Sequence, residues 1–156
     1  MRQTVRIGIT AGDINGIGIE VALKALHGAD LPAGQRAILI GDLPVIRAQC
    51  RRFRLPVPPA WDPAEGPVPA APVVVWDPWP GQGLRWEPGT LRAEAGRAAA
   101  EWITFGVQAC QRGILDALVT APISKEGLHR AGYAYPGHTE MLAALTGTKS
   151  FAMMLF

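Results

Sequence analysis

This chain of 156 residues has few histidines, few cysteines and a small net charge. Each of these features excludes some classes of protein. A net charge of +2, spread over scattered basic residues, gives no footprint for nucleic-acid binding. The one basic cluster, residues 51–54, is expected to be the solvated end of a helix. Cys50 and Cys110 lie outside any Cys-x-x-Cys pattern, which argues against a disulfide framework or a zinc site. We expect both to be buried free thiols in a reducing cytoplasm.

Long apolar runs are also absent. No stretch approaches the roughly 20 apolar residues that a helix needs to cross a bilayer. The sequence enters a strand-like run at residues 5–9 without the basic start and apolar core of a signal peptide. We therefore expect a soluble, cytoplasmic protein with neither a membrane nor a nucleic acid as its partner.

The residues that are present predict an α/β fold. Hydrophobic residues make up 49% and charged residues 18% of the chain, an ordinary globular composition. Strand-like and helix-like segments alternate, which predicts a layered, largely parallel sheet with helices on both faces. The expected strands are residues 5–10, 37–41, 72–76, 115–120 and 151–156, and the expected helices are residues 18–27, 43–53, 91–112, 125–131 and 140–145. The last strand is an apolar run typical of a buried position.

Capping and terminating residues support two of these helices. The long helix has Thr90 as its expected N-cap and Gly113 as its stop. Its apolar stripe is formed by Leu91, Ala95, Ala98, Trp102, Ile103 and Val107. The short helix at 125–131 lies between Ser124 and Gly132. Residues 56–89 differ from the rest because they are rich in proline and tryptophan, and we expect an irregular excursion that carries one edge strand. No internal domain boundary is assigned within residues 1–156.

Two loops carry candidate binding residues. Gly12, Gly16 and Gly18 lie between an expected strand and an expected helix, where glycine permits close approach of the backbone to a ligand. Val21 occupies the place of the third glycine of a dinucleotide fingerprint, so a tight structural turn and a ligand loop both remain open. His27 and His129 are expected to be surface residues.

The second loop region, residues 116–140, is the most informative part of the sequence. A short strand ends in a polar turn with Lys125, and a later turn places His138 and Thr139 at the start of a helix. A helix N-terminus with a hydroxyl and an imidazole is suited to phosphate or carboxylate, so we expect an anionic small-molecule substrate. The alternatives are a capping role for His138 and a structural ion pair for Lys125. A hydrolase is disfavoured because Ser124 lies in no Gly-x-Ser-x-Gly elbow.

These residues resemble a known family. Thr120-Ala121-Pro122-Ile123-Ser124-Lys125 and Pro136-Gly137-His138-Thr139-Glu140 are similar to the two-part signature of the 4-hydroxythreonine-4-phosphate dehydrogenase family, with Ser124 in place of asparagine. The loop Gly12-Asp13-Ile14-Asn15-Gly16-Ile17-Gly18-Ile19-Glu20 resembles the family's Gly-Asp-Pro-x-Gly-Ile-Gly-Pro-Glu, with both prolines replaced by isoleucine. Pro88-Gly89-Thr90 through Gly96-Arg97-Ala98-Ala99 fits as well, so the similarity covers nearly all of the chain.

The resemblance implies a fold like that of isocitrate and isopropylmalate dehydrogenases. It also implies NAD-dependent oxidation and decarboxylation of 4-phosphohydroxy-L-threonine in pyridoxal 5'-phosphate (vitamin B6) biosynthesis. His138 and Thr139 would bind substrate, Lys125 would contact an anion, and Gly12, Asp13, Gly16 and Gly18 would form a loop at the cleft or cofactor. The family enzymes are homodimers that use a divalent metal, zinc, magnesium or cobalt.

The family enzyme is about twice as long as this chain and holds its metal through three histidines beyond the His-Thr-Glu motif. No histidine follows His138 here, so we expect no metal ligand in this chain and interpret it as an N-terminal portion of a two-lobed dehydrogenase. Two alternatives remain: a non-catalytic binding or assembly fragment, and a paralogue acting on threonate or erythronate 4-phosphate. A coding sequence that continues into three spaced histidines would favour the enzyme.

Overall fold

The computed structural model describes residues 4–28, 30–152 and 154. Strands and helices alternate as the sequence predicts. The elements are β1 (Val5–Thr10), α1 (Gly18–His27), β2 (Gln35–Ile40), α2 (Leu43–Phe53), a 3-10 turn (Pro63–Glu65), β3 (Val73–Trp76), α3 (Ala93–Gln111), β4 (Ala117–Thr120), α4 (Lys125–Arg130) and α5 (His138–Thr146). Most boundaries fall within two residues of the prediction, the usual uncertainty at element ends.

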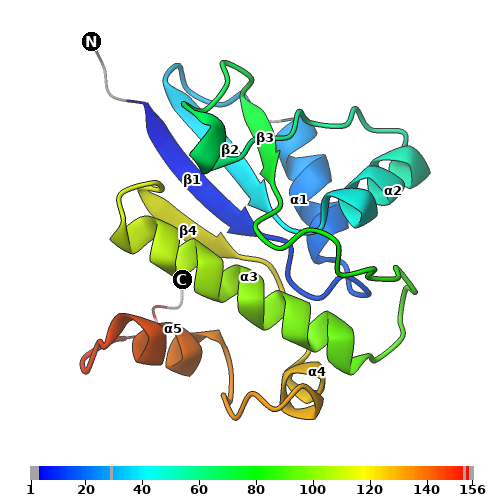
Figure 1. Ribbon diagram of the computed structural model, residues 1–156, viewed down its shortest axis with the longest axis vertical. Coiled ribbons are helices and arrows are strands. Elements are labelled where there is room, and N and C mark those ends of the chain that lie inside the picture. Colours follow the sequence, from blue (N-terminus) through cyan, green and yellow to red (C-terminus); the bar gives the residue numbers. More distant parts are fainter. Residues whose placement is uncertain (1–3, 29, 153, 155–156) are drawn as a thin grey trace.

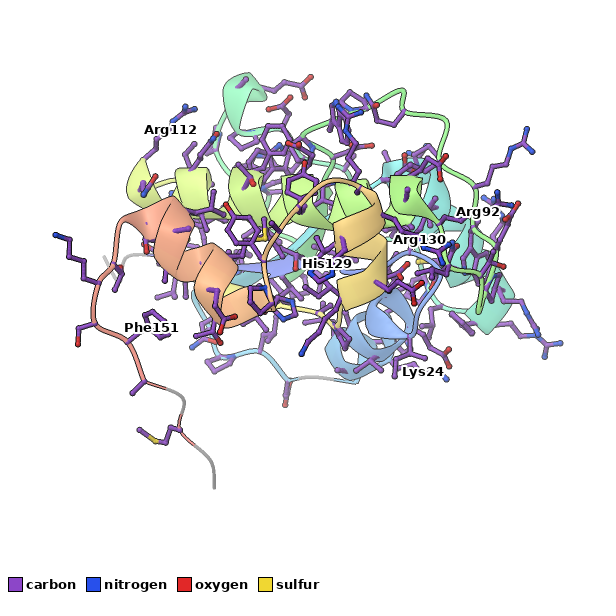
Figure 2. The ribbon with its side chains drawn as sticks, turned by 90° about the horizontal axis from the view of Figure 1, so that it is seen from below. Lys24, Arg92, Arg112, His129, Arg130 and Phe151 are labelled. Atoms are coloured by element: carbon purple, nitrogen blue, oxygen red, sulfur yellow. The ribbon has the colours of Figure 1, made fainter. Side chains whose placement is uncertain are left out.

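The four strands form one parallel sheet in the order β3-β2-β1-β4. The chain moves outward from β1 through β2 to β3, and α3 then carries it back across the sheet to β4 on the other side of β1 (Figure 1). Crossovers between parallel strands are right-handed in nearly all proteins, so this reversal of direction places α1 and α3 on opposite faces of the sheet (Figure 2). The predicted fold class is confirmed, including the helices on both faces.

The long helix α3 covers one face with the predicted apolar stripe. Ala95, Ala98, Trp102, Ile103 and Val107 are at most 5% exposed. Cys50 is buried and Cys110 half-buried, and both are free thiols. None of the helices within the described ranges combines the length and the apolar composition that crossing a membrane requires.

The predicted start of the long helix is wrong by two residues. Arg92, and not Thr90, is the N-cap residue, and the helix begins at Ala93. Thr90 is instead held in the preceding turn, because its N–H donates to the carbonyl of Glu87 and its own carbonyl accepts from the side chain of Asn15. The contact with Asn15, which no local sequence pattern shows, therefore keeps Thr90 in the turn although threonine is a good N-cap residue.

The proline- and tryptophan-rich excursion carries one edge strand, as predicted. β3 lies at one end of the sheet, and the excursion runs beside it. The N–H of Val75 donates to the carbonyl of Pro59 over 2.9 Å, and the N–H of Trp61 donates to the carbonyl of Val75 over 2.8 Å. Proline is tolerated on this outer side because its carbonyl can accept a hydrogen bond from the strand, while its missing N–H is not needed there.

The predicted strand at 151–156 is not formed by the residues that are described there. Phe151, Ala152 and Met154 have no strand conformation, and residues 153, 155 and 156 lie outside the described residues. Phe151 is 54% exposed and Met154 is 75% exposed, and Phe151 follows α5 on the trailing chain (Figure 2). An apolar run indicates what a segment would bury, but a strand also needs a neighbour to pair with its backbone groups.

At the carboxyl end of the sheet, the loops after β1 and β4 touch backbone to backbone. The N–H of Asp13 donates to the carbonyl of Pro122 over 3.0 Å. Gly12 has a φ of +68°, and a Cβ at this position would lie 2.3 Å from the Pro122 carbonyl oxygen. A Cβ at Gly18 would lie 2.7 Å from the carbonyl oxygen of Ala11 and 3.0 Å from Cβ of Ala121. Only glycine permits this approach of the two loops.

At the amino end, Arg6 joins β1 to the start of β4. Its N–H donates to Oδ2 of Asp116 over 2.7 Å, and its guanidinium donates to Oδ2 of Asp116 over 3.2 Å and to the carbonyl of Gly113 over 2.9 Å. These hydrogen bonds lower the pKa of Asp116 below its ordinary value of 3.8.

Gly12→Ala should destabilise the chain by about 2 kcal/mol or more, because it combines a positive φ with a clash against backbone. Urea denaturation of the variant gives the free energy of unfolding. Gly16→Ala is the matched control, since Gly16 is exposed and its nearest contact, the Asp13 carbonyl oxygen, is 3.3 Å from the added Cβ. Equal losses in both variants would contradict the role given to the Gly12 contact.

Asp116→Asn should cost about 0.5–1 kcal/mol at pH 7, a value discounted for the partial exposure of the pair. Because the folded pKa is lowered, the contribution is fully present above 3.8 and is lost as the pH falls through the folded value. The difference from wild type should therefore shrink in urea titrations below pH 4. Glu126→Gln, in the exposed pair with Arg130 on α4, should change little at either pH.

Candidate functional site

The candidate site lies where the order of strands reverses. The last residues of β1 and β4, Thr10 and Thr120, are paired in register, and the chain builds β2 and β3 on one side of β1 before it returns to place β4 on the other side. In open α/β sheets the crevice outside such a switch point is the usual ligand site. The predicted glycine loop and the predicted anion loop are the two loops that meet there.

The start of α5 supplies backbone donors near this switch point. Gly137 is its N-cap residue and makes no side-chain cap, and the first bond within the helix runs from the N–H of Met141 to the carbonyl of Gly137. The N–H groups of His138, Thr139 and Glu140 therefore precede the helical ladder. With the positive end of the helix dipole, they form a surface suited to an anion.

His138 connects this helix start to the end of β4. Its Nε2 lies 3.2 Å from the carbonyl oxygen of Ala121. A carbonyl only accepts, so Nε2 carries the hydrogen, and Nδ1 is left with a lone pair when the ring is neutral. Burial of the half-buried ring lowers the pKa of His138 below its ordinary value of 6.5, with the Ala121 hydrogen bond acting in the opposite sense. The imidazole is therefore neutral at pH 7 and offers Nδ1 as an acceptor.

Lys125 is the nearby cationic side chain. It is exposed, and its Cε would lie 3.8 Å from a Cβ at Gly137, so its side chain passes beside the start of α5. Ser124 is the N-cap of α4, as predicted, because its Oγ accepts from the N–H of Gly127 over 3.0 Å. The Ser124 hydroxyl thus has a structural partner, and no catalytic base contacts it among the described residues.

The glycine loop divides into a packed part and an open part. Gly12 is buried against the backbone of residues 121–122, and Gly18 is buried against the Ala11 carbonyl and the side chains of residues 121–122, so neither has open space beside it. Asp13 is half-buried and accepts from the N–H of Asn15 over 2.9 Å. Gly16 is exposed at the tip. Of the four predicted loop residues, Asp13 and Gly16 are therefore the two with access to a ligand.

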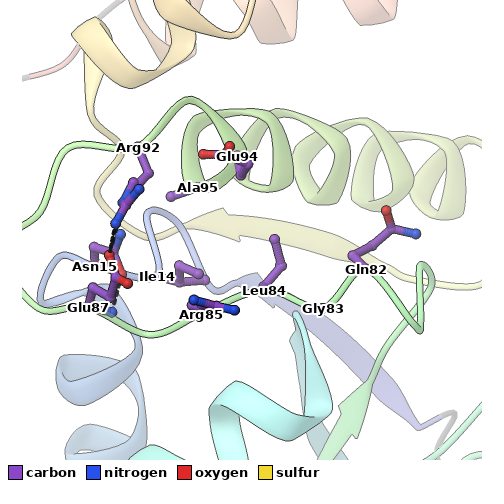
Figure 3. A pocket seen from close by; sticks show the side chains of 10 residues that line it. All are labelled: Ile14, Asn15, Gln82, Gly83, Leu84, Arg85, Glu87, Arg92, Glu94 and Ala95. Atoms are coloured by element: carbon purple, nitrogen blue, oxygen red, sulfur yellow. Dashed lines mark hydrogen bonds and ion pairs between the residues drawn. The ribbon is translucent and has the colours of Figure 1, made fainter.

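Asn15 was not predicted, although it organises the loop. It is 5% exposed, its Oδ1 accepts from the N–H of Glu87 over 2.7 Å, and its Nδ2 donates to the carbonyl of Thr90 over 3.0 Å. It forms one wall of a cavity of about 280 Å³ between this loop, the excursion and the start of α3 (Figure 3). The sequence contained one sign of this role, namely an asparagine at the second variable position of the Gly-Asp-x-x-Gly loop.

The remaining histidines lie outside the switch point. His27 and His129 are exposed, as predicted, and His129 contacts the carbonyl of Tyr135 over 3.2 Å within the turn that leads to α5. Residues 4–28, 30–152 and 154 contain no group of three or more histidine, cysteine or acidic side chains placed to hold a metal ion.

Comparison with known proteins agrees with this geometry. Residues 34–156 match the family model described as "Pyridoxal phosphate biosynthetic protein PdxA". Over 96% of its length the chain is 41% identical to a 4-hydroxythreonine-4-phosphate dehydrogenase of Desulfosudis oleivorans, covering 44% of that protein. Over 96% of its length it is 39% identical to a D-threonate 4-phosphate dehydrogenase of Cupriavidus necator, covering 45% of that protein.

A solved structure is similar over the whole chain. The crystal structure of a 4-hydroxythreonine-4-phosphate dehydrogenase from Klebsiella pneumoniae superposes with a TM-score of 0.82 and 34% identity, covering 100% of this chain and 48% of that one. The chain thus spans a little less than half the length of the relatives it matches. The family match over residues 34–156 and the shared fold show that this chain belongs to the PdxA family of pyridoxal phosphate biosynthetic proteins.

Proposed function

We propose that this chain supplies the anion site and one wall of the active-site cleft of an NAD-dependent dehydrogenase that oxidises and decarboxylates 4-phosphohydroxy-L-threonine in pyridoxal 5'-phosphate biosynthesis. The observation that carries the proposal is the uncapped start of α5, which the His138–Ala121 hydrogen bond ties to the switch point of the sheet. Family membership supports the reaction class.

In this proposal the phosphate group of the substrate lies on the N–H groups at the start of α5, beside Lys125. Backbone donors there keep their orientation without loss of side-chain entropy, and the ammonium group of Lys125 neutralises part of the added charge. The Thr139 hydroxyl, on the first turn of α5, adds a donor. His138 is neutral at pH 7, so its contact is a hydrogen bond accepted at Nδ1 from a substrate hydroxyl.

The family's chemistry, hydride transfer to NAD and decarboxylation assisted by a divalent cation, needs groups that the described residues do not supply. They contain no cluster of metal ligands, and the cavity of about 280 Å³ beside Asn15 is small for a dinucleotide. We assign to this chain binding and orientation only. The cofactor loop at Asp13 and Gly16, the cytoplasmic location and the homodimer belong to the same proposal.

D-Threonate 4-phosphate is a second candidate substrate, because the Cupriavidus necator relative bears that name at 39% identity. The two molecules share the phosphate, the 3-hydroxyl and the carboxylate, and differ at carbon 2, which carries an amino group in one and a hydroxyl in the other. The proposed anion site binds the phosphate group, which both molecules carry. Titrating both compounds would show whether this chain also discriminates at carbon 2.

His138→Ala should weaken binding of D-threonate 4-phosphate at pH 7.5 about threefold to tenfold, the equivalent of one neutral hydrogen bond of about 0.5–1.5 kcal/mol. NMR titration of the chain gives the dissociation constant and reports shifts of the 138–140 amides. His27→Ala, on the exposed side of α1, is the control and should bind like wild type. Unchanged binding in His138→Ala, or amide shifts remote from α5, would contradict the site.

The chain by itself should not oxidise 4-phosphohydroxy-L-threonine with NAD, whichever of zinc, magnesium or cobalt is added. A reaction that depends on a bound cation loses several kcal/mol of transition-state stabilisation without it. NADH appearance is followed by absorbance, with the Desulfosudis oleivorans enzyme as the positive control. Clear turnover would show that a complete active site forms from these residues, and would overturn the assignment of binding and orientation alone.

A further inference from the structure

The two parts of the proposed anion site are joined by one turn of the chain. Lys125 lies at the start of α4, and the N–H groups of residues 138–140 lie at the start of α5. Residues 131–137 form the turn that leads from the end of α4 to the start of α5. Because α4 has only six residues, the path of this turn decides how close Gly137 comes to Lys125. Cε of Lys125 would be 3.8 Å from a Cβ at Gly137.

The helices on either side of the turn both rest on α3, one after the other along its length (Figure 1, Figure 2). A Cβ at Gly96 of α3 would lie 2.2 Å from the carbonyl carbon of Gly127 in α4, so these two helices touch backbone to backbone. Leu128 of α4 and Met141 of α5 are at most 1% exposed, and both belong to one apolar cluster with Ile103 of α3. The long helix therefore fixes α4 and α5 relative to each other.

Tyr133 ties the turn itself to the same helix. Its half-buried ring packs against the apolar cluster, and its hydroxyl donates to Oε1 of Glu101 on α3 over 2.5 Å. In the part of the chain that the structure describes, the other hydrogen bonds of residues 131–137 stay within residues 127–141. The bond from Tyr133 to Glu101 is therefore the hydrogen bond that joins this turn to a distant element.

The charge of Glu101 strengthens this hydrogen bond. Burial of the ring, followed by the neighbouring Glu101 carboxylate, raises the pKa of Tyr133 to about 12, with Arg97 acting in the opposite sense. The hydroxyl therefore keeps its hydrogen at neutral pH and remains a donor. A hydrogen bond to a carboxylate is about twice as strong as one between neutral groups. Loss of the hydroxyl should accordingly have a measurable effect on the turn.

We propose that Tyr133 is a positioning residue of the anion site. Its hydrogen bond to Glu101 fixes the turn 131–137, and thereby holds the start of α5 and the His138 imidazole beside Lys125. Tyr133 acts through the turn and not by contact with the substrate. The inference rests on the anion site of the proposed function and names the residue that sets the geometry of that site.

The chain offers a matched control for the tyrosine hydroxyl. Tyr135, two residues later, is half-buried against the same cluster, and its hydroxyl makes no hydrogen bond within the described residues. Tyr133→Phe and Tyr135→Phe therefore each remove one hydroxyl and keep the ring. On α3, Glu101→Ala removes the acceptor, whereas Glu101→Gln keeps an oxygen that can accept from Tyr133.

Three measurements test the proposal. NMR titration with D-threonate 4-phosphate gives the affinity and the shifts of the 138–140 amides. Hydrogen exchange follows the amides of Tyr133 and Met141, which donate to the carbonyls of Leu128 and Gly137. The nitrogen shifts of the His138 ring report which nitrogen carries the hydrogen. Urea unfolding checks that every variant is folded.

Tyr133→Phe should bind D-threonate 4-phosphate about threefold or more weakly than wild type, because the binding-competent turn is less populated. Its Met141 amide should exchange about tenfold faster, as expected when one charge-assisted hydrogen bond is lost from a local opening equilibrium. The preference of His138 for a hydrogen on Nε2 should weaken as well. Glu101→Ala should behave like Tyr133→Phe, the double variant should be no worse than either, and Glu101→Gln should lie closer to wild type.

Tyr135→Phe should resemble wild type in all three measurements. Equal affinity, exchange and His138 tautomer in Tyr133→Phe and Tyr135→Phe would overturn the proposal. A loss of urea stability in Tyr133→Phe without a change in affinity or tautomer would show a structural role only, and would overturn it equally. A wild-type chain whose 138–140 amides do not respond to the ligand would instead contradict the proposed function. The exchange and tautomer measurements need no ligand and would still decide the role of Tyr133.

Discussion

The close approach of the loops after β1 and β4 is the constraint on which the candidate site depends. Gly12 and Gly18 let the backbone of residues 11–18 lie against residues 121–122, with the hydrogen bond from Asp13 to Pro122 closing the contact. Because β4 lies on the side of β1 opposite to β2, this contact lies at the switch point of the sheet, where ligands usually bind in open α/β folds. A side chain at Gly12 would separate the two loops.

The start of α5 is tied to these loops by the side chain of His138. His138 donates to the Ala121 carbonyl, which belongs to the same loop that packs against Gly12. The helix start, the imidazole and the glycine loop are thereby fixed relative to one another. Partial burial of the ring lowers the pKa of His138 below its ordinary value of 6.5, which further favours the neutral imidazole at pH 7. Backbone N–H groups and Lys125 supply positive charge at the start of α5, and the Glu140 carboxylate lies beside them, because its Oε2 would be 3.5 Å from a Cβ at Gly137.

The excursion rich in proline and tryptophan contacts the rest of the fold in two places, at the β3 edge and at the glycine loop. Its first part covers the β3 edge through residues 59–61, where the carbonyl of Pro59 accepts from Val75 and the N–H of Trp61 donates to Val75. Its last part is tied to the glycine loop by Asn15, which holds Glu87 and Thr90 in place before α3 begins. The sheet is thus closed at one edge and open at the other, where β4 presents Val119 and its neighbours.

The sequence by itself determined the alternation of strands and helices, the apolar stripe of α3 and the Ser124 cap, because these depend on local periodicity and short-range hydrogen bonds. Its two motifs also pointed to the anion loop, the glycine loop and the family. Only the tertiary structure decided that Gly12 and Gly18 contact Pro122 and Ala121, that Asn15 delays the start of α3, and that burial lowers the pKa of the His138 imidazole. Residues 151, 152 and 154 are not a strand, although the sequence predicted one, because no neighbouring strand pairs with them among the described residues. Each of these features depends on a partner far away in the chain, which no local pattern specifies.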